Sequence, residues 1–574
     1  MRSLFRVRQL TLVATVGLIV AACAPGQSGD PSGSGAASAA PSSNLTGGTV
    51  RIGIGGFPDS LNPGNGLLSE SYTLYELVFD TPVALAADGS YVPELATEWG
   101  VSDDGLTWTL TLRDDVFFHD GTPMTSEDVK YTLELYRDTA DFAYLPSYPD
   151  VFHTIEAPDA THVTMTADSP IGNFESRMAF IYVIPKHIWE PAIAALDGDP
   201  VAFENEEMIG TGPFTMVENV QDESTELASN EDYWKGAPFV DGLIFQTITN
   251  GDARVAALTN GDIDLIVDLP TTAVPGLNNN DEVTVVLADP VSGSLRDVFF
   301  NIVAPDDCPT DDGGVCNGHP ALKDLAVRQA MATAVDKTQI ITVGQSGLAT
   351  PGLTLVPPGL GDYYASEIAD YAFDPAAANQ ILEDAGYTDS DGNGIRECLP
   401  TQDCPTGDLT FRFNYPDDID SGPAEAELLE GMWSAIGVRI EIQALDADTL
   451  TSVCCPAFDY DVMMWGWGSD PDPQFLLGVA HCGEISTGFS ETGYCNPEYD
   501  ELYDRQGVEP DHEARVALIH EMQQILVDEV VYIIPYYEQV IEAHRVDSFT
   551  GWSDEFASLG LEDPSQLSVL RPTE

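Results

Sequence analysis

The sequence predicts an α/β fold divided into two or three domains. The chain has 574 residues, which is more than one hydrophobic core usually organises. Hydrophobic residues make up 43% of the chain and aromatic residues 9%, and this composition argues against global disorder. Patterns typical of short strands and of helices are mixed throughout, which favours α/β lobes.

The first elements are read directly from the pattern of apolar residues. Residues 49–54, TVRIGI, alternate as a half-buried strand does. A Gly- and Pro-rich stretch at 55–63 ends that strand in a loop. Residues 108–113 predict a second alternating strand. A helix is predicted to follow Thr125, with Ser126 as its cap and apolar residues at helical spacing after it.

The second half of the chain continues the same mixture. Helical spacing predicts helices at 322–337, 374–386, 423–436 and 512–528. Short apolar or alternating runs predict strands at 283–287, 297–302, 409–415, 438–444, 459–465 and 531–537. We find no internal repeat.

The N-terminus predicts export. Basic residues within the first eight positions precede an apolar run, 10–22, that is too short to span a bilayer as a permanent helix. The run ends in Val-Ala-Ala-Cys, which resembles a lipobox, so residues 1–22 are expected to be a signal peptide and Cys23 to be lipidated. The alternative is simple cleavage before Cys23, which would leave a free thiol. Residues 23–47 are low-complexity and are expected to be a flexible, lipid-anchored linker.

The charge balance limits the partners. The chain carries 22 Lys and Arg against 94 Asp and Glu, a formal net charge of −72. Nucleic acid is excluded as a partner because binding a polyphosphate needs clustered positive charge. The acidity has two interpretations, which are a preference for cationic ligands and a soluble, self-repelling surface, and the second is the simpler.

Eight cysteines remain besides Cys23, and export permits disulfides. Eight cysteines allow 105 connectivities. Three local pairs are suggested because each closes a short loop: Cys308–Cys316, Cys398–Cys404 and Cys482–Cys495. The adjacent Cys454 and Cys455 either pair with each other or send one partner to the Cys482 loop. A zinc site using Cys316 and His319 is the alternative, and a disulfide is favoured in an exported chain.

Five sequence blocks, in a fixed order, resemble a known family. They are 93–96 with 103–108 and 112–121, then 210–214, then 230–236, then 254–264, and then 327–330 with 335–337. The chain resembles the extracellular solute-binding proteins of family 5, the peptide- and dipeptide-binding lipoproteins of ABC transporters. The resemblance covers nearly the whole mature chain.

The resemblance implies a two-lobed α/β fold of the periplasmic-binding-protein kind, with a ligand cleft between lobes joined by two crossing strands. Lobe one would comprise 48–295 and 536–574, with an extra subdomain inserted at about 85–205, and lobe two 296–535. The implied role is to capture a peptide outside the membrane and deliver it to the permease of an ABC importer, as a monomer held to the membrane only by its lipid. An oligosaccharide or another small solute is the alternative ligand.

The segment around two tryptophans is the main candidate for the ligand site. Trp465 and Trp467 offer apolar platforms with one N–H donor each, and Gly466 would let a ligand approach the backbone. In peptide-binding relatives an aspartate here holds the peptide's amino terminus, and Asp470 is our candidate, with Asp472 second. The spacing departs from the family pattern, in which that aspartate lies three residues before the Asp-Pro. Alternatively, both aspartates only cap or turn the loop.

The loop after the first strand is expected to form the opposite wall, through Gly56 and Phe57. In relatives this segment hydrogen-bonds an extended peptide through its backbone, as an added strand would. The alternative is an ordinary Gly-rich turn.

A separate motif at 389–397 predicts a structural calcium loop. Oxygen ligands at alternate positions around a Gly turn suit Ca²⁺, and the loop resembles the first half of an EF-hand. The expected ligands are Asp389, Asp391, Asn393, Ile395 and Glu397. Pro400 stands where the bidentate Glu at position 12 would be, and a plain turn rich in Asp and Asn is the alternative.

The chain lacks the catalytic motifs that we sought. It has no phosphate loop, no HExxH and no GxSxG elbow. We therefore predict no enzymatic activity and no required cofactor, and an exported hydrolase is the rival of another class.

Overall fold

The computed structural model describes residues 45–288, 291, 293–417, 419, 421–553 and 560–573. The predicted signal peptide, the lipidation of Cys23 and nearly all of the predicted linker lie outside the described residues. None of the helices within these ranges is both long enough and apolar enough to cross a membrane.

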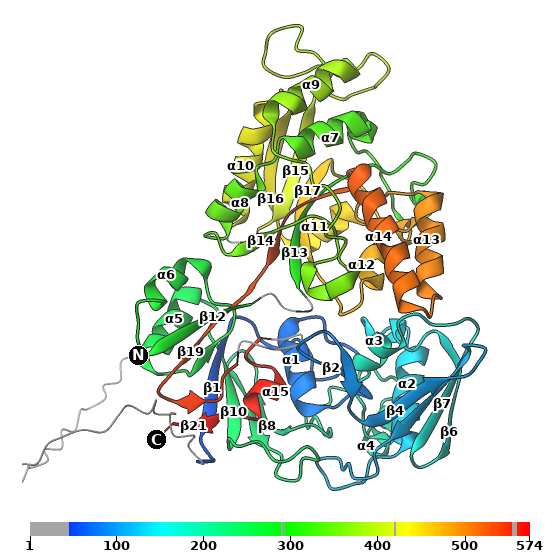
Figure 1. The fold of residues 1–574 in the computed structure, drawn as a ribbon, viewed down its shortest axis with the longest axis vertical. Helices are drawn as coiled ribbons and strands as arrows, with labels where there is room; N and C mark the ends of the chain where they lie inside the picture. The colour runs from blue at the N-terminus through cyan, green and yellow to red at the C-terminus, as the bar shows by residue number, and fades with distance from the viewer. Residues whose placement is uncertain are drawn as a thin grey trace, which may run out of the picture. The chain divides into compact units, whose positions relative to one another are not determined.

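Lobe one, which we define as residues 45–288 and 540–573, is built on a seven-stranded sheet ordered β12-β19-β11-β1-β10-β9-β8. Its strands are β1 (Thr49–Ile54), β8 (Phe214–Val220), β9 (Ser224–Ser229), β10 (Gly242–Thr247), β11 (Leu265–Ile266), β12 (Val283–Ala288) and β19 (Val540–Arg545). The predicted first strand is confirmed. Val50 and Ile52 of β1 are fully buried between parallel neighbours β10 and β11. Figure 1 shows the blue β1 and the red β19 in the same lobe, although they lie at opposite ends of the chain.

Short helices complete lobe one. They are α1 (Ser69–Val78), α5 (Gly251–Asn260), α6 (Val274–Leu277) and α15 (Pro564–Leu567), with the 3₁₀ turn η2 (Thr271–Ala273) and the strand pair β20 (Phe549–Thr550) and β21 (Arg571–Pro572). Asn250 caps α5 by accepting a hydrogen bond from the Ala253 N–H at 2.9 Å, and Gly261 ends it in the left-handed region. The sequence analysis did not predict these helices.

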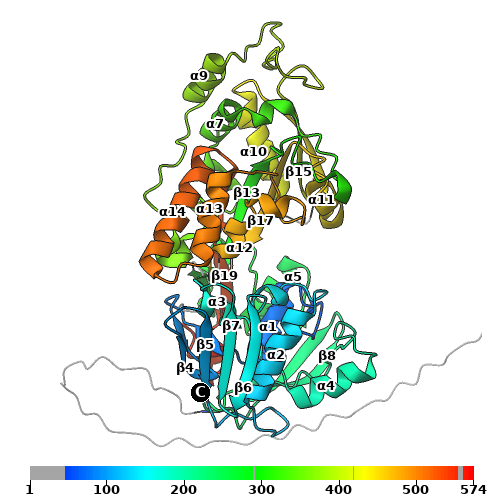
Figure 2. The same ribbon diagram turned by 90° about the vertical axis from the view of Figure 1, so that its right-hand side faces the viewer.

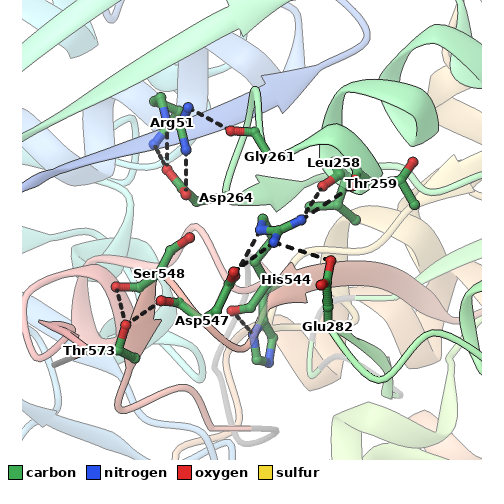
Figure 3. A network of polar contacts seen from close by, with 11 residues as sticks. Arg51, Leu258, Thr259, Gly261, Asp264, Glu282, His544, Asp547, Ser548 and Thr573 are labelled. Carbon is green, nitrogen blue, oxygen red and sulfur yellow. Dashed lines mark hydrogen bonds and ion pairs between the residues drawn. The ribbon is translucent and has the colours of Figure 1, made fainter. Parts of the chain in front are cut away.

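Two arginines join segments of lobe one (Figure 3): Arg51 joins β1 to the segment after α5, and Arg545 joins the C-terminal return of the chain to the end of α5. Arg51 of β1 forms a bidentate pair with Asp264, at 2.8 and 2.9 Å, and Nη1 donates to the Gly261 carbonyl. Arg545 of β19 donates to the Leu258 carbonyl at the end of α5 and pairs with Asp547 at 2.7 Å. Bidentate guanidinium–carboxylate pairs are geometrically specific, so they fix the register of residues that are distant in sequence.

A subdomain is inserted into lobe one. Its four-stranded sheet has the order β4-β5-β7-β6. The elements are β2 (Val83–Leu85), β3 (Tyr91–Pro93), β4 (Ala96–Val101), β5 (Thr107–Leu112), α2 (Ser126–Asp138), η1 (Leu145–Ser147), β6 (Phe152–Asp159), β7 (His162–Ala167), α3 (Phe174–Ala179) and α4 (Lys186–Ala195). The predicted strand at 108–113 is confirmed as β5. Trp108 stacks on Phe174, with ring centroids 3.9 Å apart, which joins the sheet to α3.

The predicted cap of α2 is wrong by one residue. Thr125 is the extended residue before the helix, and its N–H donates to the Asp128 carboxylate at 2.9 Å. The Ser126 hydroxyl instead donates to the Asp159 carbonyl. A competing acceptor on β6 therefore decides which hydroxyl residue caps the helix.

Lobe two, which we define as residues 294–538, is built on a six-stranded sheet ordered β14-β18-β13-β17-β15-β16. The strands are β13 (Ser294–Phe300), β14 (Ala349–Pro351), β15 (Thr410–Pro416), β16 (Arg439–Leu445), β17 (Val462–Gly468) and β18 (Tyr532–Glu538). The central strand β13 pairs antiparallel with both β17 and β18. The predicted strands of this half are confirmed, although β17 begins at Val462 and not at 459. Its start is delayed because the Asp461 carboxylate accepts the His319 N–H and pairs with Arg412.

Helices cover both faces of this sheet (Figures 1 and 2). They are α7 (Leu325–Thr333), α8 (Lys337–Gly344), α9 (Pro375–Ala385), α10 (Gly422–Ser434), α11 (Ala447–Cys454), α12 (Gln474–Gly478), α13 (Pro497–Gly507) and α14 (His512–Asp528). The 3₁₀ turns are η3 (Thr310–Asp312), η4 (Pro320–Lys323), η5 (Pro358–Tyr363) and η6 (Cys482–Ile485). Val298 and Phe300 of β13 pack with α7 to α10, whereas Leu295 and Phe299 pack with α11 to α14. Successive side chains of β13 point to opposite faces of the sheet and therefore pack into two separate hydrophobic cores.

One predicted helix is shorter than expected. The predicted helix at 322–337 corresponds to α7, which begins at Leu325 after the 3₁₀ turn η4 and ends at Thr333. Asp336 lies outside helical geometry, and its side chain accepts the Gln339 N–H at 3.1 Å as the N-cap of α8. The end of the predicted range therefore leads into the next helix. The other three predicted helices of this half correspond to α9, α10 and α14.

The chain changes lobes twice. It leaves the lobe-one sheet after Ala288 and enters the lobe-two sheet at Ser294. It leaves lobe two after Glu538 and re-enters the lobe-one sheet at Val540. The second crossing lies a few residues later than the expected position near 535, because β18 continues to pair with β14 as far as Glu538.

All eight described cysteines are paired. The three local disulfides that the spacing suggested are present, Cys308–Cys316, Cys398–Cys404 and Cys482–Cys495. Cys454 and Cys455 are bonded to each other, which selects one of the two alternatives left open. The zinc alternative is contradicted, because the Cys316 sulfur is in a disulfide and buried His319 accepts the Ala321 N–H.

Candidate functional site

The two tryptophans lie at the end of β17, next to the central strand β13. Trp465 is opposite Asp297 and Trp467 is opposite Leu295 in the antiparallel register. Both indoles are half-buried. Trp467 packs edge-on against Phe475, with ring centroids 5.6 Å apart, which fixes its orientation.

The glycine between them has a packing role that the sequence did not suggest. A Cβ on Gly466 would lie 2.5 Å from the Leu295 carbonyl oxygen, so a side chain here would separate β17 from β13. Gly468 has open space around it. The close packing of β13 against Gly466 therefore explains why this position is a glycine. Contact between Gly466 and a ligand stays a prediction.

Asp470 lies where lobe two contacts the inserted subdomain. Its carboxylate accepts a hydrogen bond from the Tyr148 hydroxyl at 3.2 Å. Tyr148 is stacked on Phe180 with centroids 4.9 Å apart, and its carbonyl accepts from Arg177 at 2.9 Å. Burial raises the pKa of Asp470 to about 6, against the lowering effect of the Tyr148 hydrogen bond. The carboxyl is only partly covered and has no ion-pair partner among the described residues.

Further contacts join the two sides close to Asp470. The Tyr91 hydroxyl of β3 donates to the Pro471 carbonyl at 3.3 Å. The Gly172 N–H of the subdomain donates to the Gly507 carbonyl of α13 at 3.0 Å. The segment after β17 is thus held between the lobes, and the aromatic residues on the subdomain side were not predicted from the sequence.

Asp472 has a different environment. Both its oxygens accept from the Arg515 guanidinium of α14, at 2.6 and 2.7 Å, and the side chains of the pair are 6% and 1% exposed. One oxygen also accepts the Gln474 N–H at the start of α12. Gln506 and Tyr363 accept the remaining Arg515 donors. These contacts occupy the carboxylate and favour a structural role for Asp472 over the predicted ligand contact.

The predicted wall in lobe one is shaped by charged neighbours. A Cβ on Gly56 would lie 1.9 Å from a Glu70 carboxylate oxygen, and one on Gly55 would lie 2.9 Å from the Arg254 guanidinium. The Gly56 carbonyl accepts from the Thr247 hydroxyl at 3.3 Å, and Phe57 is half-buried. The Glu70 carboxylate therefore lies against Gly56, and backbone contact of Gly56 with a ligand stays a prediction.

The structure also brings together acidic residues that sequence reasoning missed. Asp297 of β13 is fully buried, neither of its oxygens has a hydrogen-bond partner among the described residues, and burial raises its pKa to about 7. Glu491 lies beside it and beside the Trp467 indole, and burial raises the Glu491 pKa well above its usual value. The signal that could have found Asp297 is an acidic residue inside the predicted strand, in the sequence LRDVFF.

The predicted calcium loop places its acidic side chains together. Carboxylate oxygens of Asp389, Asp391 and Glu397 lie within 4.8 Å of one another. Asp389 accepts three backbone N–H groups of the loop, from Gly392 to Gly394, and Glu397 accepts the N–H of Ser390. The Asn393 side-chain oxygen accepts the Ile395 N–H at 2.7 Å. The donor set is all oxygen and fits Ca²⁺ chemically.

The chain matches known proteins over most of its length. Residues 90–486 match the family described as "Bacterial extracellular solute-binding proteins, family 5 Middle". The di/tripeptide-binding protein 2 of Pseudomonas aeruginosa is 26% identical over 487 residues, covering 81% of this chain and 84% of the relative.

Two solved structures share the fold. The oligopeptide-binding protein AppA of Bacillus subtilis, solved with a nonapeptide, has a TM-score of 0.73 and 22% identity, and the match covers 92% of this chain and 100% of AppA. NikA of Brucella suis, solved with Fe(III)-EDTA, has a TM-score of 0.77 and 22% identity over the same shares. With more than half of its length matched to the family, this chain belongs to the family 5 bacterial extracellular solute-binding proteins.

Proposed function

We propose that the protein binds a peptide between its two lobes and delivers it to the permease of an ABC importer. The observation that carries the peptide assignment is the position of Asp470, a partly covered carboxyl at the contact between the lobes without a cationic partner among the described residues. The names of relatives support it, since they include a di/tripeptide-binding protein and an oligopeptide-binding protein.

The peptide's ammonium group would supply the cationic partner that Asp470 lacks among the described residues. The carboxyl is desolvated, which raises its pKa to about 6. A cation beside it would favour the ionised form and gain a charge-assisted hydrogen bond, which is about twice as strong as a neutral one. Tyr148, fixed by Phe180, holds the carboxyl in one orientation from the other lobe. The ammonium would therefore contact a group to which both lobes contribute.

Ligand binding would stabilise the closed form. A ligand shifts a two-state equilibrium only by its difference in affinity for the two states. A ligand held by Asp470 and by the backbone at Gly56 contacts both lobes only when they are closed, so it favours closure. We propose that the permease recognises this closed form.

An oligosaccharide is the second candidate. Trp465 and Trp467 are half-buried at the end of β17, and their exposed faces would stack on sugar rings as well as on a peptide. We propose no catalysis for either ligand, in keeping with the family. Anchoring by a lipid on Cys23 is likewise a proposal, and it rests on the sequence of the first 23 residues alone.

Thermal melting with matched ligands tests the proposal. Ligands that bind only the native state raise the melting temperature by mass action. We expect short peptides with a free amino terminus to raise it, and the same peptides acetylated at that terminus to raise it much less. Asp470→Asn should remove the difference between the two. A shift with pooled oligosaccharides alone would overturn the peptide assignment, and hydrolysis of unlabelled peptide by the pure protein would support an enzyme instead.

A further inference from the structure

A small cavity in lobe one combines apolar walls with three carboxylates. Its volume is about 90 Å³, and it lies between β1, α1 and the segment that follows β11. One water needs only about 10–15 Å³ of such space, so the cavity has room for the end of a long side chain. The apolar walls are formed by Ile54, Pro58, Leu74, Phe245 and Val267, and the carboxylates belong to Glu70, Asp268 and Glu562.

Glu562 is the most buried of the three carboxylates. It is 6% exposed, and its Oε2 has no hydrogen-bond partner among the residues that the structure describes. Its close neighbour is another acid, Glu542 of β19, which is 2% exposed and already accepts the Leu561 N–H at 2.6 Å. Burial and the neighbouring Glu562 raise the pKa of Glu542 well above its usual value. The two carboxyls also interact through a hydrogen bond, which raises the pKa of Glu542 and opposes the rise in the pKa of Glu562. Neither forms an ion pair with a basic side chain among the described residues, so the acid pair lacks a counter-ion.

The nearest basic group does not neutralise the cavity. Arg254 lies near Asp268, but its guanidinium donates to the backbone carbonyls of Ile248 and Asp268, at 2.8 and 3.0 Å, and not to a carboxylate. Burial and the negative Glu70 raise the pKa of Asp268, and attraction to Arg254 opposes them. Asp268 is nevertheless exposed to solvent, so the cavity is open at this residue. In the described part of the chain no ion pair joins these cavity carboxylates to a basic side chain.

The chemistry of the cavity selects a cation on an apolar stem. Lysine and arginine bury their methylene chains along apolar surface while the charged end finds an acceptor. Here apolar side chains would contact the stem, and desolvated carboxylates would accept from the ammonium or guanidinium. A neutral or acidic side chain would leave the buried acids unpaired or add repulsion.

The cavity adjoins the predicted lobe-one wall. Ile54 and Pro58, which flank residues 55–57, both line it, and the Glu70 carboxylate of the cavity lies against Gly56. We propose that this cavity is a subsite for a basic side chain, lysine or arginine, of a peptide lying along residues 55–57. This inference rests on the proposed peptide-binding function and makes that function selective for cationic peptides.

Matched peptides on the full-length protein test the subsite. Calorimetry would compare tetraalanine peptides that carry one lysine with the same peptides carrying norleucine, its uncharged counterpart, at each position in turn. We expect the lysine peptide to bind about tenfold or more tightly at one position, the size of a single charge-assisted contact. Equal affinities at every position would overturn the subsite and leave peptide binding intact. No binding by any peptide would overturn both.

Three variants then assign the preference to the cavity. Glu562→Gln and Glu70→Gln should each lower the lysine-to-norleucine affinity ratio by about threefold or more, because each removes one charge that faces the ligand cation. Glu70 is half-exposed, so its variant keeps the test valid if Glu562→Gln fails to fold. Glu218→Gln, an exposed lobe-one carboxylate on β8, is the matched control and should leave the ratio unchanged. If Glu562→Gln and Glu70→Gln both keep the wild-type ratio, the cavity is not the subsite.

Discussion

We expect the two aspartates after β17 to have different roles, with Asp472 structural and Asp470 binding the ligand. Asp472 and Arg515 form a bidentate pair whose side chains are 6% and 1% exposed. Removing one partner of a buried pair costs about 3–5 kcal/mol, because the remaining charge is left uncompensated. Gln506 and Tyr363 still accept from Arg515 after Asp472→Asn. We therefore expect the lower end of that range, about 3 kcal/mol.

This loss should be visible as a lower melting temperature without ligand. The entropy of unfolding is about 2.1 cal/mol/K per residue, so a cooperative unit of about 250–500 residues loses about 1–2 °C per kcal/mol. Asp472→Asn should thus lower the midpoint by about 3–6 °C. Scanning calorimetry of the ligand-free protein is the assay, because it also reports whether the two lobes unfold together.

Asp470→Asn is the matched control, since it makes the same chemical change two residues away. Its carboxyl hydrogen-bonds only the Tyr148 hydroxyl among the described side chains, and the residue is only partly covered, so the midpoint should move by about 1 °C or less. The affinity for peptides with a free amino terminus should instead fall at least about tenfold. The opposite result, in which Asp472→Asn lowers peptide affinity at unchanged stability and Asp470→Asn lowers the melting temperature, would refute these two roles.

Three further predictions test other features. Asp297 has a pKa of about 7 in the folded protein, above its ordinary value of 3.8, because burial disfavours the ionised form. Its contribution to stability is therefore fully present below about pH 3.8 and is lost as pH rises to about 7. The unfolding free energy should fall between about pH 4 and pH 7 by up to about 1.4 kcal/mol per pH unit and level off above pH 7, and Asp297→Asn should flatten this slope in urea titrations. Calcium chelation should lower the melting temperature, by an amount corresponding to about 2.7 kcal/mol if calcium was present at 100 times its dissociation constant. Asp391→Ala should abolish this sensitivity to chelation, whereas Asp403→Ala, a change at an exposed neighbour, should keep it. If chelation has no effect on the wild type, the calcium prediction is wrong. Cys23→Ala should release the protein from the membrane fraction and prevent incorporation of labelled fatty acid, and unchanged labelling would contradict lipidation at that residue.

Local patterns were sufficient for part of the secondary structure and for three disulfides. The alternation of 49–54 and the helical spacing of 512–528 are properties of neighbouring residues, so they survive in the structure as β1 and α14. The predictions failed where a residue distant in sequence formed a hydrogen bond with a local side chain. Ser126 does not cap α2 because Asp159 accepts from its hydroxyl, and β17 starts late because Asp461 is held by His319 and Arg412.

The sequence by itself determined the class of protein, since five ordered blocks and the charge balance need no coordinates to be recognised. It also named the segment 465–472, but it could not separate Asp470 from Asp472. Only the tertiary structure did that, because Arg515 lies 43 residues after Asp472 and the subdomain residue Tyr148 lies 322 residues before Asp470. The cavity of Glu70, Asp268 and Glu562 likewise joins three distant segments. Whether a carboxylate is paired, desolvated or open to a ligand depends on neighbours that folding supplies, and no local pattern encodes them.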